Sequence, residues 1–195
     1  FAAAYHRLEE RFGSVCFKFV RDEGGQSYHR IDNSQRGYQA LFHPHATRIT
    51  FDEAFAALSE RETFAPLLVM PYLSGDEISA DCLQTEDGLI ILPRIKGATR
   101  VERMCFSEEI LRITHEVCDA VKLQCPCNIQ FKYLGDVPYF LEVNTRMSGG
   151  VQMACAASGV NIPDIAVNKL LGIRKPWTIQ KEERFVTYVE TPVIL

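Results

Sequence analysis

Two strand–turn–strand patterns constrain the fold more than any other feature of this sequence. Residues 76–97 and 128–144 are each rich in apolar, β-branched and aromatic side chains, and each is interrupted by a short polar turn, EDG in the first and GD in the second. A short turn of this kind between two apolar runs predicts a β-hairpin. Because helical patterns alternate irregularly with these hairpins, we expect an α+β fold and not a doubly wound parallel sheet.

Helical spacing and helix caps predict the remaining elements. A capping box, T-F-D-E at 50–53, opens one helix, and Ser107 caps another. The predicted helices cover residues 1–13, 51–61, 108–122, 150–159 and 162–172, and further strands cover 14–20, 27–31 and 65–73. Residues 32–49 show no clear period, so we interpret them as a loop.

A break near Pro71 divides the chain. Proline has no N–H group, so a strand cannot continue its pairing through it. We expect residues 1–68 to form a partial N-terminal lobe that carries a glycine turn. Residues 69–175 would form a C-terminal lobe with a metal site, and residues 176–195 a C-terminal extension. Neither end resembles a natural terminus, so we expect a piece of a larger protein whose N-terminal lobe is missing.

Composition excludes several classes of function. The 195 residues are 47% hydrophobic and 24% charged, with a formal net charge of −4. Because there is no basic excess and no run of Lys or Arg, we expect no nucleic-acid partner. No apolar stretch approaches the ~18 residues of a membrane span, and no secretory signal is visible. A cytoplasmic protein is therefore expected.

The seven cysteines are expected to be reduced thiols. Their number is odd and most of them lie in apolar segments. The only close pair, C-P-C at 125–127, lacks the C-x-x-C spacing of zinc sites. We therefore expect core thiols that form no disulfide.

The hairpin at 128–144 predicts a polar face. With its register centred on Asp136, Gln130 lies opposite Glu142, and Asn144 lies beside them, while apolar pairs fill the other face. Carboxylate and carboxamide oxygens are ligands that Mg²⁺ accepts. An ordinary solvated face is the alternative. Phe140, which this register puts on the polar side, favours a covered face.

A lysine and a glycine turn suggest a phosphate site near the N-terminus. Lys18 lies between two phenylalanines in an apolar strand, so its ammonium must either reach solvent or meet an anion. The strand leads into Gly24 and Gly25, whose backbone N–H groups can approach phosphates closely. An outward-facing lysine and an ordinary hairpin turn are the alternative.

Two further groups are candidates around and after Pro71. A free carbonyl at Met70 and an N–H at Leu73 could bind an adenine edge, and Glu77 could bind ribose hydroxyls; a plain linker is the alternative. Arg94 shares a strand face with Lys96, which indicates a nearby anion or, alternatively, a solvated sheet edge.

The order of these features resembles the ATP-grasp superfamily, and most of all the ATP-grasp domains of the carbamoyl phosphate synthase large subunit and its relatives. The segments "NIQF", "YFLEVNTRMSGG" and "ASGVNIPDIAVNKLLGI" resemble family motifs. The resemblance covers roughly residues 10–173 and is most specific in 128–173. It implies an ATP-grasp fold, in which two α+β lobes clasp a nucleotide.

The resemblance also implies residue roles. Gln130, Glu142 and Asn144 would hold Mg²⁺ or Mn²⁺. Arg146 would contact the γ-phosphate or an acyl phosphate, and Arg94 would be a second catalytic cation. Lys18, Gly24 and Gly25 would contact the phosphates of ATP. Met70 and Leu73 would contact adenine, and Glu77 would contact ribose. Thr145 replaces the usual proline of the motif, and the glycine turn has fewer glycines than the family's flap.

The expected activity is that of an ATP-dependent carboxylate–amine (or carboxylate–thiol) ligase, inactive as this fragment alone. A carboxylate would be activated as an acyl phosphate and attacked by a nucleophile. The expected partners are therefore a small-molecule carboxylate and a nucleophilic co-substrate, with a homodimer possible. The alternative is a non-catalytic nucleotide-binding module that serves as a sensor or scaffold.

Overall fold

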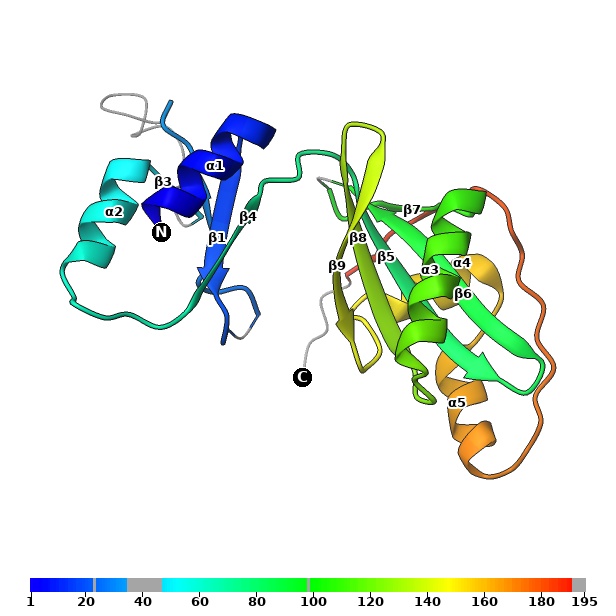
Figure 1. Cartoon of the computed structure of the whole chain (residues 1–195). Helices are drawn as coiled ribbons and strands as arrows, with labels where there is room; N and C mark the ends of the chain where they lie inside the picture. Colours follow the sequence, from blue (N-terminus) through cyan, green and yellow to red (C-terminus); the bar gives the residue numbers. More distant parts are fainter. Residues whose placement is uncertain (23, 35–46, 98, 191–195) are drawn as a thin grey trace, which may run out of the picture. The chain divides into compact units, whose positions relative to one another are not determined.

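The computed structural model describes residues 1–22, 24–34, 47–97 and 99–190. The chain forms two compact units, Phe1–Leu73 and Ser74–Leu195, and each is described here by itself (Figure 1). Both contain helices packed on a mainly antiparallel sheet, as expected for an α+β protein. Among the described residues, no helix has the length and apolar character needed to cross a membrane.

The first unit is a four-stranded sheet with two helices. Its sheet has the order β3-β2-β1-β4. The elements are α1 (Ala2–Phe12), β1 (Val15–Phe19), β2 (His29–Ile31), β3 (Arg48–Ile49), α2 (Phe51–Ser59) and β4 (Leu67–Pro71). Strand β3 pairs parallel to β2 and lies in the segment 32–49 that we had predicted to be a loop; residues 35–46 of that segment lie outside the described part of the chain.

The first unit has its own apolar core. Phe17 and Ile31 of the sheet pack with Tyr5 of α1 and Ala54 of α2, and all four are buried. The predicted capping box opens α2, because the Thr50 hydroxyl accepts from a backbone N–H in the first turn while the third helical residue reaches back. One face of the sheet is therefore core, and the other face carries the polar side chains described below.

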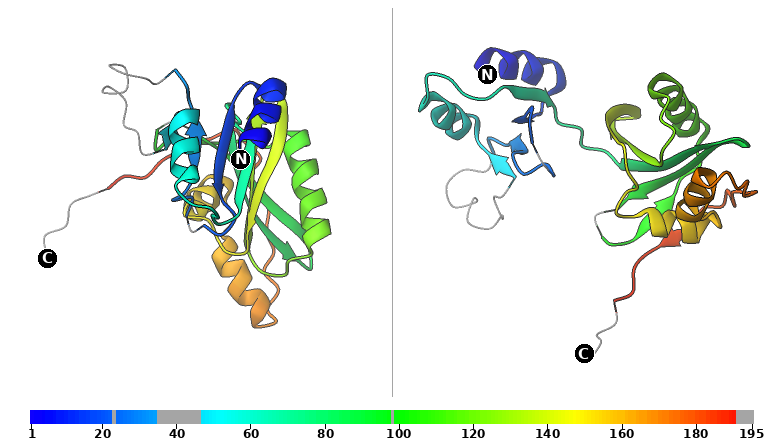
Figure 2. Two further views of the ribbon diagram at one scale, coloured as in Figure 1. Left: turned by 60° about the vertical axis from the view of Figure 1, so that its left-hand side comes forward. Right: turned by 90° about the horizontal axis from the view of Figure 1, so that it is seen from below.

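The second unit is a six-stranded sheet with helices on both faces. Its order is β10-β7-β6-β5-β8-β9. The elements are β5 (Glu77–Thr85), β6 (Gly88–Lys96), β7 (Glu102–Met104), α3 (Glu108–Val121), β8 (Cys127–Leu134), β9 (Val137–Asn144), α4 (Val151–Ser158), α5 (Ile162–Leu170) and β10 (Phe185–Val186). Helix α3 lies on one side of the sheet, and α4 and α5 lie on the other (Figure 2, right).

Alternation along β5 separates two environments. Ile78, Ala80 and Cys82 face the core beneath α3. The residues between them, Ser79 and Asp81, point to the opposite face, because successive strand residues alternate. Both are polar and at most 1% exposed. This polar interior is the foundation of the candidate site.

The boundary between the units differs from the predicted one. We expected it after residue 68, but β4 pairs with β1 from Leu67 to Pro71 and so belongs to the first unit. The segment from 176 is not a separate extension either. Its strand β10 pairs with β7, and the Trp177 indole N–H donates to the Thr85 hydroxyl over 3.2 Å. These contacts join it to the second unit.

The β8–β9 register is correct at its base and wrong at its tip. Asn128 pairs with Asn144 and Gln130 with Glu142, as predicted, but an irregularity after Gln130 places Phe131 opposite Phe140. The physical reason is the turn, which has only two residues. The strand pairs next to it are centred between those two residues, whereas the pairs at the base are centred on Asp136.

The shift moves an aromatic side chain to the other face. Phe140 packs edge-on against Phe131, with ring centroids 6.2 Å apart, on the α3 side. We had expected Phe140 to cover the polar face, and this expectation is wrong. Tyr139 and Leu141, predicted to be core, are 38% and 40% exposed because β9 is an edge strand.

Candidate functional site

The predicted metal ligands share one face of the β8–β9 hairpin. Gln130 and Glu142 are direct cross-strand partners, so their side chains point to the same side. The Asn144 amide donates to Glu142 Oε1 over 2.9 Å, and the Gln130 amide N–H donates to Asn128 Oδ1 over 3.1 Å. In this arrangement the exposed carboxylate of Glu142 and the Gln130 carbonyl oxygen remain available to a ligand. Carboxylate and amide oxygens suit a hard cation such as Mg²⁺.

A buried polar network supports this face from below. Asn128 is fully buried and donates to Ser79 Oγ over 2.9 Å and to Asp81 Oδ1 over 3.1 Å. Asp81 also accepts from Arg94 over 2.8 Å. A continuous chain of hydrogen bonds therefore runs from Arg94 through Asp81 and Asn128 to Gln130. Because every member is buried or half-buried, the chain holds the Gln130 amide in one orientation.

Arg94 is bound inside the protein and is not the free cation that we expected. Its guanidinium is 1% exposed and binds Asp81, Glu102 and, over 3.0 Å, the Ser148 hydroxyl. An arginine in a sheet interior requires carboxylate partners, because an unpaired buried charge is very costly. The sequence does indicate an anion near Arg94, but that anion is supplied by the chain itself. Arg94 thus positions Asp81, Glu102 and Ser148, and its predicted catalytic role stays a prediction.

Gly150 is part of this arrangement. A Cβ atom there would overlap the Arg94 guanidinium and approach its Cζ to 2.8 Å. The neighbouring Gly149 has open space around the same position. The second glycine of the S-G-G motif therefore makes room for Arg94.

Glu77 lies between two lysines. Its carboxylate is 2.6 Å from the Lys96 ammonium and 3.6 Å from that of Lys132, and its side chain is 26% exposed. Lys96 is therefore also paired with a carboxylate of the chain. The predicted contact of Glu77 with ribose stays a prediction, and a ligand there would have to share Glu77 with these lysines.

Arg146 is exposed and follows the metal candidates directly. Its guanidinium donates to the Met147 carbonyl over 3.1 Å. The described hydrogen-bond partner of Glu142 is the Asn144 amide. Within the described ranges, no ion pair joins Glu142 to a cation. The Arg146 side chain can therefore reorient toward a ligand without breaking an internal salt bridge.

In the first unit, Lys18 is half-buried on the face opposite the core. It alternates with the buried Phe17, which packs beneath the helices. The glycine turn follows, with left-handed φ angles of 65° at Gly24 and 72° at Gly25 and open space around both. This turn can approach a ligand closely. Its contact with phosphate stays a prediction.

The backbone of β4 corrects one predicted contact. The Tyr72 N–H donates to the Ser14 carbonyl over 2.8 Å, and the β1–β4 register pairs Met70 with Cys16. In an antiparallel ladder, hydrogen-bonded pairs recur at every second residue. Met70 therefore belongs to the set whose backbone faces β1, and its carbonyl is not free. Leu73 belongs to the alternate set of residues, whose backbone groups point away from β1. Its adenine contact therefore stays a prediction.

Sequence reasoning missed several polar residues of these faces. In the second unit these are Asp81, Glu102 and Ser148. Of the three, Asp81 could have been identified from the sequence, because it is a carboxylate inside an apolar strand. In the first unit, Arg30 pairs with Cys16 and therefore shares a face with Lys18. The Arg30 guanidinium stacks 4.0 Å above the Tyr72 ring. Its position in the alternation of "SYHRI" could have identified it.

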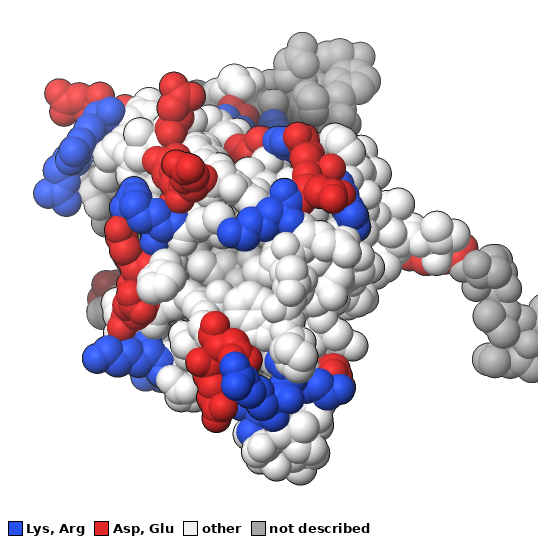
Figure 3. All heavy atoms as spheres, turned by 90° about the vertical axis from the view of Figure 1, so that its right-hand side faces the viewer, with Lys and Arg blue, Asp and Glu red and all other residues white. Residues whose placement is uncertain are grey.

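The charges on one face of the molecule are mixed. Figure 3 shows Lys and Arg interspersed with Asp and Glu around an uncharged central area. Proteins that bind nucleic acid carry a concentrated basic patch. The described residues on this face form no such patch.

Comparisons with known proteins agree with this geometry. A family model described as "ATP-grasp in the biosynthetic pathway with Ter operon" matches residues 63–192. That range includes all of the polar face of the second unit.

Curated relatives are carbamoyl phosphate synthase large chains. The chain is 28% identical to that of Clostridium botulinum over 146 residues, which is 65% of this chain and 14% of the relative. It is 30% identical to that of Clostridium perfringens over 128 residues, or 58% of this chain and 12% of the relative. The chain thus spans only a small part of the length of these relatives.

Solved structures show the same fold. N5-carboxyaminoimidazole synthetase from Staphylococcus aureus, complexed with ADP, has a TM-score of 0.67 at 11% identity, over 96% of this chain and 49% of that one. The biotin carboxylase domain of 2-oxoglutarate carboxylase from Hydrogenobacter thermophilus, with MgADP and bicarbonate, has a TM-score of 0.62 at 16% identity, over 96% and 42%.

Proposed function

Because the chain belongs to the ATP-grasp family of the biosynthetic pathway with the Ter operon, we propose that it is the ATP-binding part of an ATP-dependent carboxylate–amine or carboxylate–thiol ligase. The substrate carboxylate oxygen attacks the γ-phosphorus of ATP and ADP leaves. The nucleophile then attacks the acyl carbon of the resulting acyl phosphate, loses a proton, and releases phosphate. A small-molecule carboxylate and a nucleophile are therefore the proposed partners.

The pairing of Gln130 with Glu142 is the observation that carries this proposal. With Asn144, these residues form an oxygen-rich face that fits Mg²⁺ or Mn²⁺ beside ATP. The cation would neutralise charge on the phosphates when bound. Arg146 would add a positive charge next to the transferred phosphoryl group. The fixed orientation of Gln130 above Asn128 and Asp81 reduces the reorganisation that binding requires.

The first unit carries candidate nucleotide contacts of its own. Lys18 and Arg30 offer two cations on one sheet face for the α- and β-phosphates. Gly24 and Gly25 would allow the turn to approach those phosphates, and the Leu73 N–H would contact adenine. Glu77 would contact ribose in exchange for part of its pairing with Lys96.

One observation favours a second candidate function. Arg94, one of the two predicted catalytic cations, is neutralised by Asp81 and Glu102. A module whose metal face offers Arg146 but not Arg94 could bind Mg-ATP without turning it over, as a nucleotide sensor or scaffold.

A trapping experiment separates these functions. The full-length protein is incubated with Mg-ATP and a panel of carboxylic acids, and ADP and phosphate are measured with and without hydroxylamine. A ligase forms ADP, and a hydroxamate accumulates only with the correct acid, because hydroxylamine captures the acyl phosphate. Mg-ATP binding with no ADP from any acid supports the sensor. AMP and pyrophosphate in place of ADP contradict the proposed acyl phosphate.

A further inference from the structure

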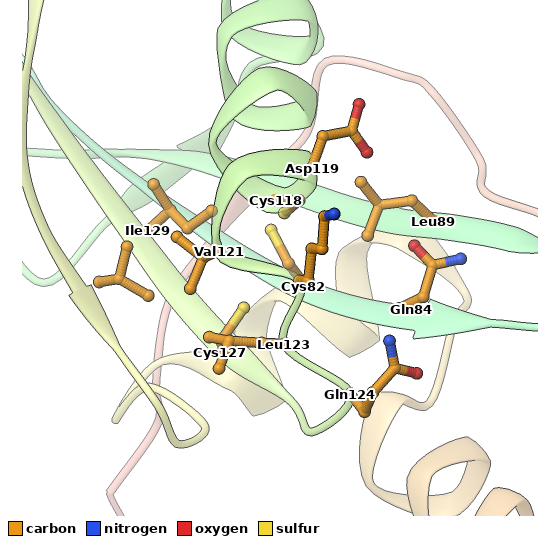
Figure 4. A pocket seen from close by; sticks show the side chains of 12 residues that line it. Cys82, Gln84, Leu89, Cys118, Asp119, Val121, Leu123, Gln124, Cys127 and Ile129 are labelled. Carbon is orange, nitrogen blue, oxygen red and sulfur yellow. The ribbon is translucent and has the colours of Figure 1, made fainter.

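Three cysteines meet on the sheet face opposite the candidate ATP site. Cys82 comes from β5, Cys127 from β8 and Cys118 from the last turn of α3, and their sulfur atoms all lie within 4.8 Å of one another. The sulfurs point toward one another beneath α3 (Figure 4). Cys82 and Cys127 are direct partners in the β5–β8 ladder, so their positions are set by the sheet. Cys82 lies 36 positions before Cys118, and eight residues separate Cys118 from Cys127, so no short metal-ligand spacing is visible.

The burial of the cluster suits a metal centre. Cys82 is fully buried, Cys127 is 5% exposed and Cys118 is half-buried. Buried cysteines often act simply as small apolar side chains. Here, however, the sulfurs border a pocket of about 330 Å³. The pocket is also lined by Lys122, Asp119 and Gln124.

The distances are close to those of a trithiolate site. With metal–sulfur bonds of ~2.3 Å, three sulfurs around one ion are ~3.8–4.0 Å apart. Each sulfur pair is therefore at most ~1 Å too wide, a change that rotation about side-chain bonds can supply. Cys118 is half-buried near a helix end, so it is the ligand that can move.

We propose that Cys82, Cys118 and Cys127 bind one thiophilic divalent cation of the Zn²⁺ or Cd²⁺ class, with a fourth position open to the adjacent pocket. Thiolate ligands select soft and borderline metals over Mg²⁺, so this site does not compete for the cation that accompanies ATP. Three thiolates and a divalent ion carry one net negative charge. Lys122, in the pocket lining, supplies a compensating positive charge, and water from the pocket completes a tetrahedron.

The protonation of the cluster is consistent with metal binding. Hydrogen bonds from the thiols of Cys127 and Cys82 lower the pKa of Cys118, so a thiolate forms more readily there. The thiolate is the ligand form of cysteine. The other two thiols release their protons as the ion binds, which makes the affinity rise with pH.

Cobalt titration tests this proposal. The reduced, metal-free full chain is titrated with Co²⁺ under anaerobic conditions, and its visible and near-ultraviolet spectrum is recorded. We expect one equivalent of Co²⁺ to give tetrahedral d–d bands and a thiolate-to-cobalt charge-transfer band. One equivalent of Zn²⁺ or Cd²⁺ should bleach both. Metal binding should also raise the Tm, since the three ligands converge only in the folded chain.

Matched variants locate the ligands. Cys118→Ser should abolish the charge-transfer band and the Tm increase, and far-UV circular dichroism checks that it is folded; Cys118→Ala is a second variant that adds no hydroxyl. Cys125→Ser is the control, because Cys125 is exposed and lies only two residues from Cys127. It should bind Co²⁺ as the parent does. An absent band, a band that survives both Cys118 variants, or a band lost in Cys125→Ser overturns the proposal.

Discussion

Gln130 and Glu142 lie directly opposite each other in the β8–β9 ladder, and the ladder shifts by one residue immediately after them. The shift sends Phe140 toward the α3 side and places Tyr139 opposite Lys132. β-bulges commonly occur beside active sites, where they re-aim side chains. The irregularity lies directly beside the candidate metal ligands.

Glu142→Gln tests the metal face directly. The substitution keeps size and hydrogen bonding but removes the charge that offsets the metal. We expect the full-length variant to fold normally, to bind Mg-ATP more weakly and to lose ATP turnover by orders of magnitude. Asp136→Asn is the matched control, since it removes the same charge from the exposed turn of the same hairpin. Near-normal turnover of Glu142→Gln would exclude the metal assignment.

Gly150→Ala should destabilise the protein through Arg94. The new methyl group would overlap a guanidinium that Asp81 and Glu102 prevent from moving away. Overpacking of this kind costs about 1–3 kcal/mol. Gly149→Ala, in open space, should change the free energy of unfolding by less than about 0.5 kcal/mol. Urea denaturation measures both; equal stabilities would show that Arg94 is not held in place.

Arg94→Met should be much more damaging than Arg103→Met. The first leaves Asp81 buried without its charge partner, which costs about 3–5 kcal/mol. The second breaks a pair with Glu183 whose side chains are 37% and 61% exposed, so solvent screening limits the loss to about 0–1 kcal/mol. Thermal unfolding of both variants gives the comparison. A small effect of Arg94→Met would mean that the buried network contributes little to stability.

The metal-free thiol cluster should show an unusual pH dependence of alkylation. Hydrogen bonds from Cys127 and Cys82 lower the pKa of Cys118, so its reactive thiolate persists as the pH falls through the range in which ordinary thiols become protonated. Iodoacetamide labelling, followed by mass spectrometry across pH, measures this. We expect the Cys118 profile to lie below that of an unstructured cysteine peptide.

Two variants test the cause of that shift. Cys127→Ala removes a donor and should move the Cys118 profile to higher pH, whereas Cys127→Ser keeps a donor and should leave it low. If the parent and the peptide gave the same profile, the thiols would not interact.

Local pattern predicted most of the helices and strands and the cross-strand pairing of two candidate metal ligands, although it missed β3. The capping box at Thr50 and the polar pair Gln130–Glu142 depend on neighbours in sequence or on one short hairpin turn. The α+β class and the family motifs follow from the same local patterns. These features could be predicted because strand alternation assigns each side chain to a face without reference to the rest of the chain.

The tertiary structure alone decided which distant residues meet. Arg94 finds Asp81 and Glu102 only because β6 lies between β5 and β7, and Cys118 reaches Cys82 and Cys127 only because α3 crosses that part of the sheet. In the first unit, pairing of β4 with β1 occupied the Met70 carbonyl. No local pattern encodes strand order or helix placement, because both result from the burial of apolar surface contributed by the whole unit.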